Sequence, residues 1–376
     1  MTEFTDAVAS APLVDHHVHG ALRRSPTRAR FEAMINEGFP GTPLAGMNPF
    51  DSQLGFALRR WCAPLLGLEP GADAEDYWAA RTAVPEPELN RLLLPSAGVS
   101  DWLIDTGYRG DEILGVGEMA DFGGRTREIV RLETVAETLA SGGAAPRDYA
   151  DAYRQAVAEA TAGPGVVGVK SIIAYRSGFD IDLSRPTDAE VAAAAAVWLA
   201  EPGEHPRLDD PVLLRFGLYT ALDRGLPIQL HVGFGDRDAD LLRVNPLQLR
   251  PFLFAAEAAG VPVLLLHCYP YEREAGVLAQ SFGTVYLDVG EAVNYVGARS
   301  PALIAAALEL APFSRVLYSS DAWGPAELHH LGARLWRRGF TEVVSRWIEN
   351  GDWTERDAIR VHGLIASENA RAVYGL

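Results

Sequence analysis

Short apolar runs recur along the chain and alternate with segments that have the spacing of amphipathic helices. Runs that are apolar almost throughout are typical of parallel strands covered on both faces. We predict eight strands, at 12–19, 101–106, 128–133, 165–174, 226–231, 261–267, 283–289 and 315–321. Eight strands separated by helices favour a closed α/β barrel, the (β/α)8 or TIM barrel, over an open sheet.

The segments between these strands are predicted to be helical. Residues 189–200 are rich in alanine, and residues 247–259 carry apolar side chains at helical spacing. Gly225 and Gly260 stand where a helix should end before a strand and where a positive φ is needed. The glycines therefore mark two of the helix-to-strand connections of the predicted barrel.

One segment does not follow the alternation of strand and helix. Residues 21–100, between the first and second predicted strands, are rich in helix formers and in Trp, Phe and Arg. We predict a helical insertion there, acting as a lid or cap over the carboxyl ends of the strands, with a contact between subunits as the alternative. The chain, residues 1–376, is then a single barrel domain that contains this insertion.

Composition and charge narrow the possible partners. Of 376 residues, 48% are hydrophobic and 22% are charged, as in ordinary globular proteins. The formal net charge of −17 argues against nucleic acid or an anionic membrane as the partner. We therefore expect a small-molecule substrate, and a homo-oligomer stays open.

The cysteines and the apolar runs indicate the compartment. Cys62 and Cys268 are far apart and form no CxxC pattern, which argues against a disulfide framework and for a reducing cytoplasm. The acidic residues 1–6 do not resemble a secretion signal, and no apolar run approaches the ~18 residues that span a membrane. We predict a cytoplasmic protein.

The sequence Asp15-His16-His17-Val18-His19 ends the first predicted strand. Side chains alternate between the faces of a strand, so His17 and His19 share one face, and His16 on the other is expected to be structural. Such a pair can begin a metal site, although on its own it is also compatible with surface residues. Later apolar runs meet further metal-capable side chains: Lys170, His231, His267 and Asp321. Because the strands of a barrel end at one mouth, we predict that these groups share a metal.

Seven motifs carry a resemblance to a known family. They are DHHVH at 15–19, VGVKSIIAYRSG at 167–178, LHVGFGD at 230–236, LLHCYPYEREAG at 265–276, VYLDVGE at 285–291, LYSSDAWGPAEL at 317–328 and SENARAVYGL at 367–376. As an ordered set they resemble the amidohydrolase superfamily, of the type called amidohydrolase family 2. More closely, the chain is similar to the amidohydrolase-like region of FluG-type proteins, in which such a barrel is fused to a glutamine-synthetase-like domain.

That resemblance implies a set of ligands. The metal-binding residues would be His17, His19, His231, His267 and Asp321. In two-metal members a carboxylated lysine on the fourth strand bridges the ions, and Lys170 stands at that place. With a single ion, His267 would instead be a free polarising group. We expect one or two divalent ions per chain, with Zn²⁺ favoured by the imidazole and carboxylate donors, and we assign Asp321 as the general base.

Each assignment has a structural alternative. Asp321 follows two serines and could cap the next helix. Lys170 could be an ion-pair partner of Glu133 or Glu118 inside the barrel. Cys268 could be a soft ligand, although we expect it to point to the other face as a small hydrophobe. The histidines in helix-like segments are predicted to lie on the surface: His329, His330 and His362.

Candidate substrate contacts come from the loops that follow the strands: Arg176, Tyr269, Arg299 and Trp323. Arg176 could bind a substrate carboxylate in bidentate fashion, and Trp323 could form an apolar wall. The alternative for each of the four is a solvated loop residue.

The sequence thus predicts a metal-dependent hydrolase that cleaves a C–N amide bond of a small, carboxylate-bearing molecule. The FluG-type resemblance points to γ-glutamyl amides. Two alternatives stay open: a single-metal decarboxylase of the same superfamily, and a non-catalytic metal-binding barrel.

Overall fold

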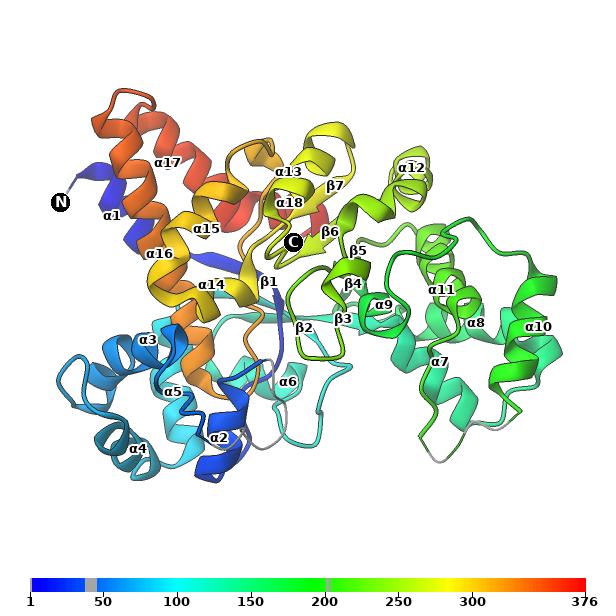
Figure 1. Ribbon diagram of the computed structural model, residues 1–376, viewed down its shortest axis with the longest axis horizontal. Coiled ribbons are helices and arrows are strands. Elements are labelled where there is room, and N and C mark those ends of the chain that lie inside the picture. The colour runs from blue at the N-terminus through cyan, green and yellow to red at the C-terminus, as the bar shows by residue number, and fades with distance from the viewer. Residues whose placement is uncertain (1, 38–45, 201–202, 204) are drawn as a thin grey trace.

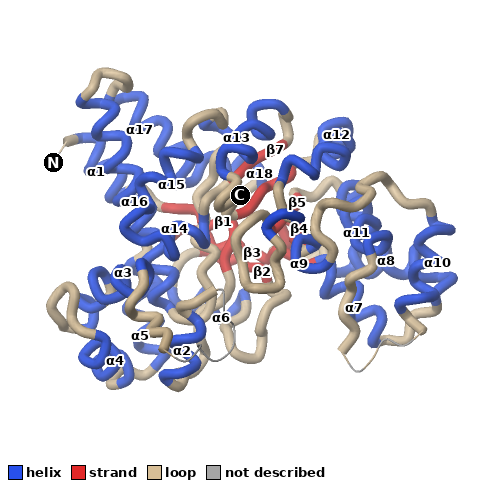
Figure 2. The backbone as a smooth tube through the Cα atoms, in the orientation of Figure 1, coloured by secondary structure: helices blue, strands red, loops and turns tan. Residues whose placement is uncertain are grey.

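One parallel sheet, curled around a common axis, forms the centre of the computed structural model, which describes residues 2–37, 46–200, 203 and 205–376 (Figures 1 and 2). Each strand pairs with the next strand of the chain, so the order in space is the order in the sequence. The strands are β1 Leu13–Val18, β2 Val99–Asp105, β3 Arg125–Arg131, β4 Val166–Ser171, β5 Ile228–His231, β6 Val263–Leu266 and β7 Val285–Leu287.

Helices surround this sheet (Figure 2). They are α1 Glu3–Ser10, α2 Arg28–Met34, α3 Gln53–Trp61, α4 Ala74–Thr82, α5 Glu86–Ser96, α6 Val116–Met119, α7 Leu132–Ser141, α8 Tyr149–Ala160, α9 Ile173–Arg176, α10 Asp188–Trp198, α11 Pro211–Arg224, α12 Arg250–Ala259, α13 Glu272–Ser281, α14 Gly290–Val296, α15 Ser300–Ala307, α16 Ala326–Glu349, α17 Glu355–Gly363 and α18 Asn369–Tyr374. Within the part of the chain that the structure describes, none of them combines the length and apolar character needed to cross a membrane.

The eighth position of the ring is occupied by an irregular segment, residues 316–322, in place of the predicted regular strand at 315–321. On one side, the Leu317 amide donates to the carbonyl oxygen of Leu287 in β7. On the other side, the amides of His16 in β1 and of His19 just after β1 donate to carbonyl oxygens of the segment. The predicted α/β barrel is therefore confirmed, and its last member departs from a strand where Asp321 takes a left-handed φ of 47°.

Helix and strand ends follow local hydrogen bonds. Gly225 and Gly260 adopt φ values of 68° and 69° at the ends of α11 and α12, as predicted. The predicted strand 165–174 is too long, because Glu133 accepts hydrogen bonds from the Ser171 hydroxyl and the Ile172 amide and turns the chain there. The predicted strand 128–133 also runs too far, since Glu133 already belongs to α7.

Apolar side chains fill the amino-terminal half of the barrel interior. Val14, Leu103, Ile129, Leu264 and Leu317 form this layer. The last helix, α18, packs against this layer through Ala370 and Tyr374. Because this end is packed with hydrocarbon, the polar side chains of the strands gather at the opposite, carboxyl-terminal mouth.

Helices α2, α3, α4 and α5 lie between β1 and β2 in the chain and gather beside the long helix α16 (Figure 1). The part of the predicted insertion at 38–45 lies outside the described residues. Glu37, just before that gap, lines the cavity at the mouth of the barrel. The role of the segment as a lid stays a prediction.

A buried ion cluster joins these helices to the barrel. Arg81 of α4 contacts Glu86 of α5, with Nη2 and Oε1 2.8 Å apart, and Glu327 of α16, with Nε and Oε1 2.7 Å apart. All three side chains are fully buried. Removing the cation would leave two carboxylates facing each other in an apolar interior, which is strongly unfavourable.

Replacing Arg81 by methionine is expected to lower the free energy of unfolding by about 3–5 kcal/mol, because it leaves two buried carboxylates without their partner. Urea denaturation followed by circular dichroism measures this loss. The matched control is Arg147→Met, whose side chain is 88% exposed and should change stability little. Equal stabilities of the two variants would contradict the structural role of the cluster.

The three histidines predicted to be on the surface are buried instead, because α16 and α17 pack against the barrel. The His329 ring contacts the carbonyl oxygen of His19 at 3.0 Å, and His330 Nδ1 lies 2.7 Å from the Ser96 hydroxyl. His362 packs against both Trp336 and Phe340. Their helical setting in the sequence did not reveal that these imidazoles have buried neighbours.

Candidate metal centre

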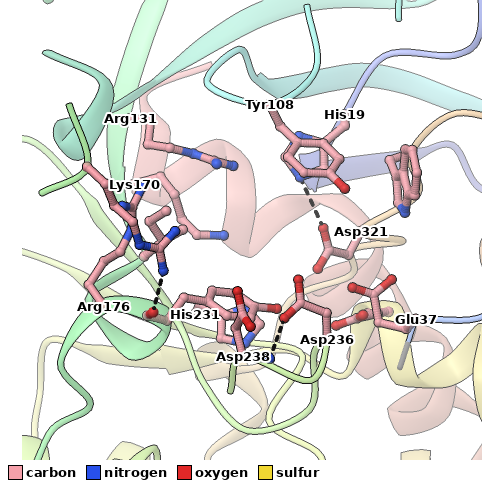
Figure 3. Close-up of a pocket in the computed structure, with 15 residues that line it drawn as sticks. His19, Glu37, Tyr108, Arg131, Lys170, Arg176, His231, Asp236, Asp238 and Asp321 are labelled. Atoms are coloured by element: carbon pink, nitrogen blue, oxygen red, sulfur yellow. Dashed lines mark hydrogen bonds and ion pairs between the residues drawn. The ribbon is translucent and has the colours of Figure 1, made fainter. Parts of the chain in front are cut away.

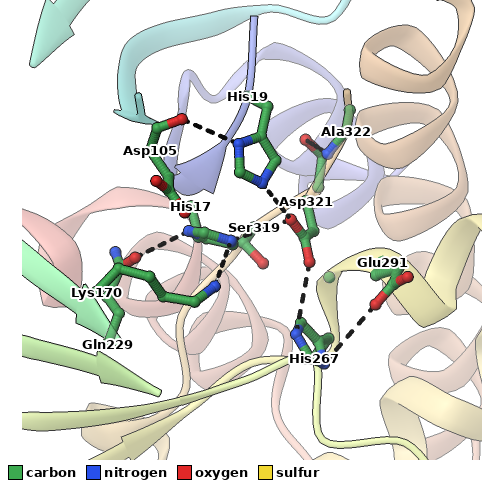
Figure 4. A network of polar contacts seen from close by, with 12 residues as sticks. His17, His19, Asp105, Lys170, Gln229, His267, Glu291, Ser319, Asp321 and Ala322 are labelled. Carbon is green, nitrogen blue, oxygen red and sulfur yellow. Dashed lines mark hydrogen bonds and ion pairs between the residues drawn. The ribbon is translucent and has the colours of Figure 1, made fainter. Parts of the chain in front are cut away.

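Asp321 lies at the centre of a polar cluster at the carboxyl-terminal mouth of the barrel (Figure 4). Its Oδ1 is 3.0 Å from Nε2 of His17 and 3.6 Å from Nε2 of His19. Its Oδ2 is 3.6 Å from Nε2 of His267. Lys170 joins the cluster from β4, with Nζ 3.1 Å from Nε2 of His17. Residues far apart in the sequence thus meet around one carboxylate.

His231, from the end of β5, completes the set predicted from the sequence. Its ring packs on His267, with ring centroids 4.2 Å apart, and on Tyr175, at 4.1 Å. It also lines the same cavity as His19, Lys170 and Asp321. The structure therefore brings all six predicted ligands to one place.

The rings of His17 and His19 are held from behind. Gln229 donates from Nε2 to the His16 carbonyl oxygen, so its Oε1 faces His17 Nδ1 at 2.8 Å and must accept a hydrogen bond. His19 Nδ1 likewise donates to the Asp105 carbonyl oxygen at 3.0 Å. Each ring then turns Nε2 toward Asp321, where that nitrogen either carries a second proton or offers a lone pair. A lone pair that faces a carboxylate needs a proton or a cation between them, and this back-bonded arrangement is usual for metal-binding histidines.

Two further rings have unsatisfied nitrogens. Both ring nitrogens of His267 and Nε2 of His231 are buried. Among the described residues, none of these three atoms has a hydrogen-bond partner. Buried polar atoms are nearly always bonded, so a missing partner is informative. Burial lowers the pKa of His19 and of His267 to about 4, so both rings are neutral at pH 7, the form that binds metal. The donor set fits a divalent cation.

Charge in the cluster is arranged for proton transfer. Burial alone would raise the pKa of the Asp321 carboxyl group, but the His17 imidazole and its hydrogen bond hold that pKa well below its usual range. Burial lowers the pKa of the Lys170 amine, against the opposing effects of Asp105 and Asp321. The site therefore combines an ionised carboxylate with an amine that loses its proton more readily than a solvated lysine.

Lys170 is also the only lysine of the sequence, since arginine supplies the other 32 of the 33 basic side chains. Wherever this chain needs only a cation, it uses arginine. An amine differs from a guanidinium in that it can lose its proton and react as a nucleophile. The amino-acid composition thus offers a signal for a chemical role at this position that motif reasoning did not use.

The backbone is strained at the two residues predicted to be catalytic. His267 and Asp321 have φ values of 49° and 47°, and Cys268 has 48°. Non-glycine residues adopt this left-handed conformation at a cost of the order of 1–3 kcal/mol each, and such strain clusters at functional sites. Cys268 is buried and its thiol faces the Leu265 carbonyl oxygen, so its predicted role as a small hydrophobe fits better than that of a ligand.

Asp288, which follows β7, is a positioning residue that sequence reasoning missed. Its Oδ1 accepts hydrogen bonds from the His267 amide at 2.8 Å and from the Ser319 hydroxyl at 2.7 Å. Its Oδ2 lies 2.9 Å from Nε2 of His16, which confirms the structural role predicted for that ring. The aspartate in the motif VYLDVGE was visible in the sequence, but its partners lie on other strands.

Asp15, the first residue of the DHHVH motif, holds the irregular segment in place. Its carboxyl group accepts from the Ser320 amide at 3.0 Å and from the Ser320 hydroxyl at 2.6 Å. This fixes the residue directly before Asp321. Together with Asp288, it sets the backbone of the segment that carries the central carboxylate.

Two carboxylates near the histidines were also not predicted. A ligand atom of Asp105 lies within 4.8 Å of those of His17 and His19, and one of Glu291 within 4.8 Å of those of His267 and Asp321, close enough in each case to share one ion. Asp105 is already neutralised by Arg131, whose Nη2 is 2.5 Å from Oδ2, so it is better suited to orient than to ligate. Glu291 remains a further candidate ligand.

The structural alternatives for two residues are wrong. Helix α16 begins at Ala326 with Pro325 before it, so Asp321 caps no helix. Lys170 pairs with neither proposed glutamate, because Glu133 bonds to Ser171 and to Ile172, and Glu118 pairs with Arg23 instead.

A cavity of about 270 Å³ opens beside the cluster (Figure 3). Arg176 and Trp323 line it, as predicted for substrate contacts. Tyr269 and Arg299 are absent from its described lining. Tyr269 is 40% exposed and packs on Phe234, and Arg299 lines a separate hollow between α15 and α16. Both were placed in loops after strands, but these loops turn away from the mouth.

The fold and the cluster define a class: an α/β barrel protein with a histidine and carboxylate site at the carboxyl ends of its strands. No family model matches the chain. It is 30% identical to the protein fluG of Emericella nidulans, in an alignment that covers 98% of this chain and 46% of that protein. The chain therefore spans just under half the length of this relative.

Solved structures share the fold. A "putative metal-dependent hydrolase" from Lactobacillus casei is 28% identical, with a TM-score of 0.83 over 100% of this chain and 98% of that one. A uronate isomerase from Bacillus halodurans is 14% identical, with a TM-score of 0.61 over 99% of this chain and 95% of that one. At that identity the second likeness concerns the fold alone.

Proposed function

We propose that this protein is a metal-dependent hydrolase that cleaves a C–N amide bond of a small, carboxylate-bearing molecule. One observation carries the proposal. Nε2 atoms of His17, His19 and His267 converge on the Asp321 carboxylate, while acceptor oxygens hold the first two rings from behind. The likeness to a protein described as a metal-dependent hydrolase agrees with it. Buried, unpaired Cys62 and Cys268 suit the cytoplasm.

The residues that would hold the metal are His17, His19, His231, His267 and Asp321, with Lys170 beside His17. Imidazole and carboxylate donors favour Zn²⁺ among the common divalent ions. When bound, such an ion activates water near neutral pH and polarises a carbonyl group. A carboxylated Lys170 would supply two more oxygen donors, and a second ion would then be expected.

The chain's own residues can carry the proton transfers. Asp321 is ionised and therefore able to accept a proton from the attacking water. As the water oxygen bonds to the carbonyl carbon and the C–N bond breaks, the same carboxyl group returns that proton to the departing nitrogen. Arg176 has buried N–H groups without partners among the described residues, which suits a substrate carboxylate.

Exhaustive chelation is expected to lower amide hydrolysis by at least about 100-fold, because several kcal/mol of transition-state stabilisation depend on the ion. Activity should return on addition of Zn²⁺, in proportion to the metal bound by elemental analysis. The assay uses amides of small dicarboxylic acids, including γ-glutamyl amides. Full activity after complete metal removal would overturn the proposal, and release of carbon dioxide in place of an amine would establish the decarboxylase alternative.

A further inference from the structure

The cavity beside the cluster has two walls of opposite charge (Figure 3). Arg131 and Arg176 lie together with Lys170 on one side in the figure, and Asp236 and Glu37 lie on the other. The described lining adds Arg207 to the cations and Glu291 to the carboxylates. In so small a cavity, this separation of charge is a constraint on what can bind.

The basic wall has unused hydrogen-bond donors. The Arg176 side chain is only 9% exposed, and its Nη2 contacts Glu137 at 3.0 Å. Its Nε and Nη1 are buried and have no partner among the described residues. Arg207 donates to the Tyr175 carbonyl oxygen and has no carboxylate within 4.0 Å in the described chain. Arg176 with its spare donors, beside the exposed guanidinium of Arg207, forms a site for a carboxylate.

Among the described residues, the carboxylates of the acidic wall form no direct ion pair with an arginine or lysine, although the charges of Arg207 and Arg109 reach Asp236. The Glu291 side chain is only 8% exposed, and it contacts His267, with Oε2 and Nδ1 3.8 Å apart. Glu37 accepts a hydrogen bond from the Tyr295 hydroxyl, and Asp236 accepts one from a backbone amide. Within the described ranges, no lysine or arginine lies within 4.0 Å of any of the three carboxylates. Burial, with repulsion from Asp321 and Asp236, raises the pKa of Glu37 to about 7.

We infer that the substrate of this site is dipolar. It is an amide whose acyl part carries a carboxylate, bound by Arg176 and Arg207, and whose amine part carries a second, cationic amine, bound by Glu37 and Asp236. This inference rests on the proposed hydrolysis for its scissile bond. Glu291 can lie beside the ammonium group or beside a metal, and the assignment of Glu37 and Asp236 is the same in both cases.

The carboxylate and the ammonium group of such a substrate each reduce the repulsion between like charges within one wall of the cavity. Like charges held together in a partly buried cavity repel each other, and an opposite charge from the ligand removes that repulsion. A substrate bound the wrong way round would place like charges against each wall. The walls therefore fix the direction in which the amide enters and so place its carbonyl group relative to Asp321.

Three matched amides test the inference. The first is the monoamide of succinic acid with diaminobutane, which carries both charges. The second is the succinic monoamide of butylamine, which lacks the cation, and the third is the butyric amide of diaminobutane, which lacks the carboxylate. We expect kcat/KM for the first to exceed each of the others by about 10-fold or more, the usual effect of a hydrogen bond to a charged group.

Substitutions should remove the two preferences separately. Glu37→Gln keeps the hydrogen bond from Tyr295 and should reduce the preference for the cationic amine to about 2-fold or less, while the preference for the carboxylate persists. Arg176→Met should do the reverse. Asp236→Asn is the second acidic variant if Glu37→Gln does not fold, and Glu349→Gln, an exposed charge removal on α16, is the matched control.

Calorimetric binding of the same three compounds separates this inference from the proposed function. If none is hydrolysed but the dipolar amide binds most tightly in a Glu37-dependent manner, the site is dipolar and the reaction is another. If all three are hydrolysed with similar kcat/KM, or if Glu37→Gln and Glu349→Gln behave alike, the dipolar substrate is wrong while the hydrolase stands.

Discussion

Replacing Asp321 by asparagine is expected to lower kcat/KM by about 10²–10⁴-fold, the usual contribution of a positioned general base. Asparagine has nearly the same shape but cannot accept the proton from water. Because His17, His19 and His267 all approach this one carboxylate, the variant should also bind metal less tightly. Steady-state kinetics with metal content measured on the same sample tests both effects.

The matched control is Asp121→Asn, an exposed aspartate remote from the mouth of the barrel, which should have unchanged kinetics. The thermal unfolding of both variants shows whether they fold. If folded, metal-loaded Asp321→Asn keeps more than a tenth of the activity, Asp321 is not the base, and the role must pass to another group, such as Glu291.

Lys170→Arg is expected to lower kcat/KM by at least about 10–100-fold, although it keeps a positive charge. This is the usual effect of losing a residue that supports a metal site. Arginine neither loses its proton nor reacts with carbon dioxide, whereas the buried Lys170 amine has a lowered pKa. If the amine is carboxylated and bridges two ions, elemental analysis of the variant should give one fewer ion per chain.

Lys170→Ala separates the two possible roles of the amine. The truncated side chain leaves space beside His17, and a free short carboxylate such as acetate can take the place of carbamate oxygens. Recovery of activity and of a second ion on addition of acetate would support the bridging carbamate. Recovery with methylamine, and not with acetate, would show that an unmodified amine is what the site uses.

The order of the strands could be predicted from the sequence, because buried parallel strands need apolar side chains on both faces. Thus β5 and β6 lie within the predicted ranges 226–231 and 261–267. The start of β3 was placed too late, because Arg125 to Arg127 are polar at an exposed end of the strand. The irregular segment 316–322 reads as a strand in sequence, and its apolar pattern does not reveal the left-handed Asp321.

The candidate ligands could be placed because each follows an apolar run, and the barrel geometry then brings them together. The residues that orient them could not be predicted in the same way. Gln229 holds the His17 ring from a strand that is not a neighbour of β1, and Asp288 fixes the His267 loop from the segment that follows the next strand. The predicted substrate contacts of Tyr269 and Arg299 were misplaced for a related reason. Alternation and periodicity of side chains do not determine the direction in which a loop turns.

The irregular joint between β1 and residues 316–322 gives the metal a second role. His17 and His19 stand on one side of that joint and Asp321 on the other, whereas consecutive strands from β1 to β7 are joined by six parallel strand pairs. An ion bound by residues on both sides of the joint would hold its two edges together. Binding of the ion would then add to the free energy of unfolding, and its loss would weaken the barrel at the joint between β1 and residues 316–322. Local opening of the barrel and occupancy of the metal site are therefore coupled through the same residues.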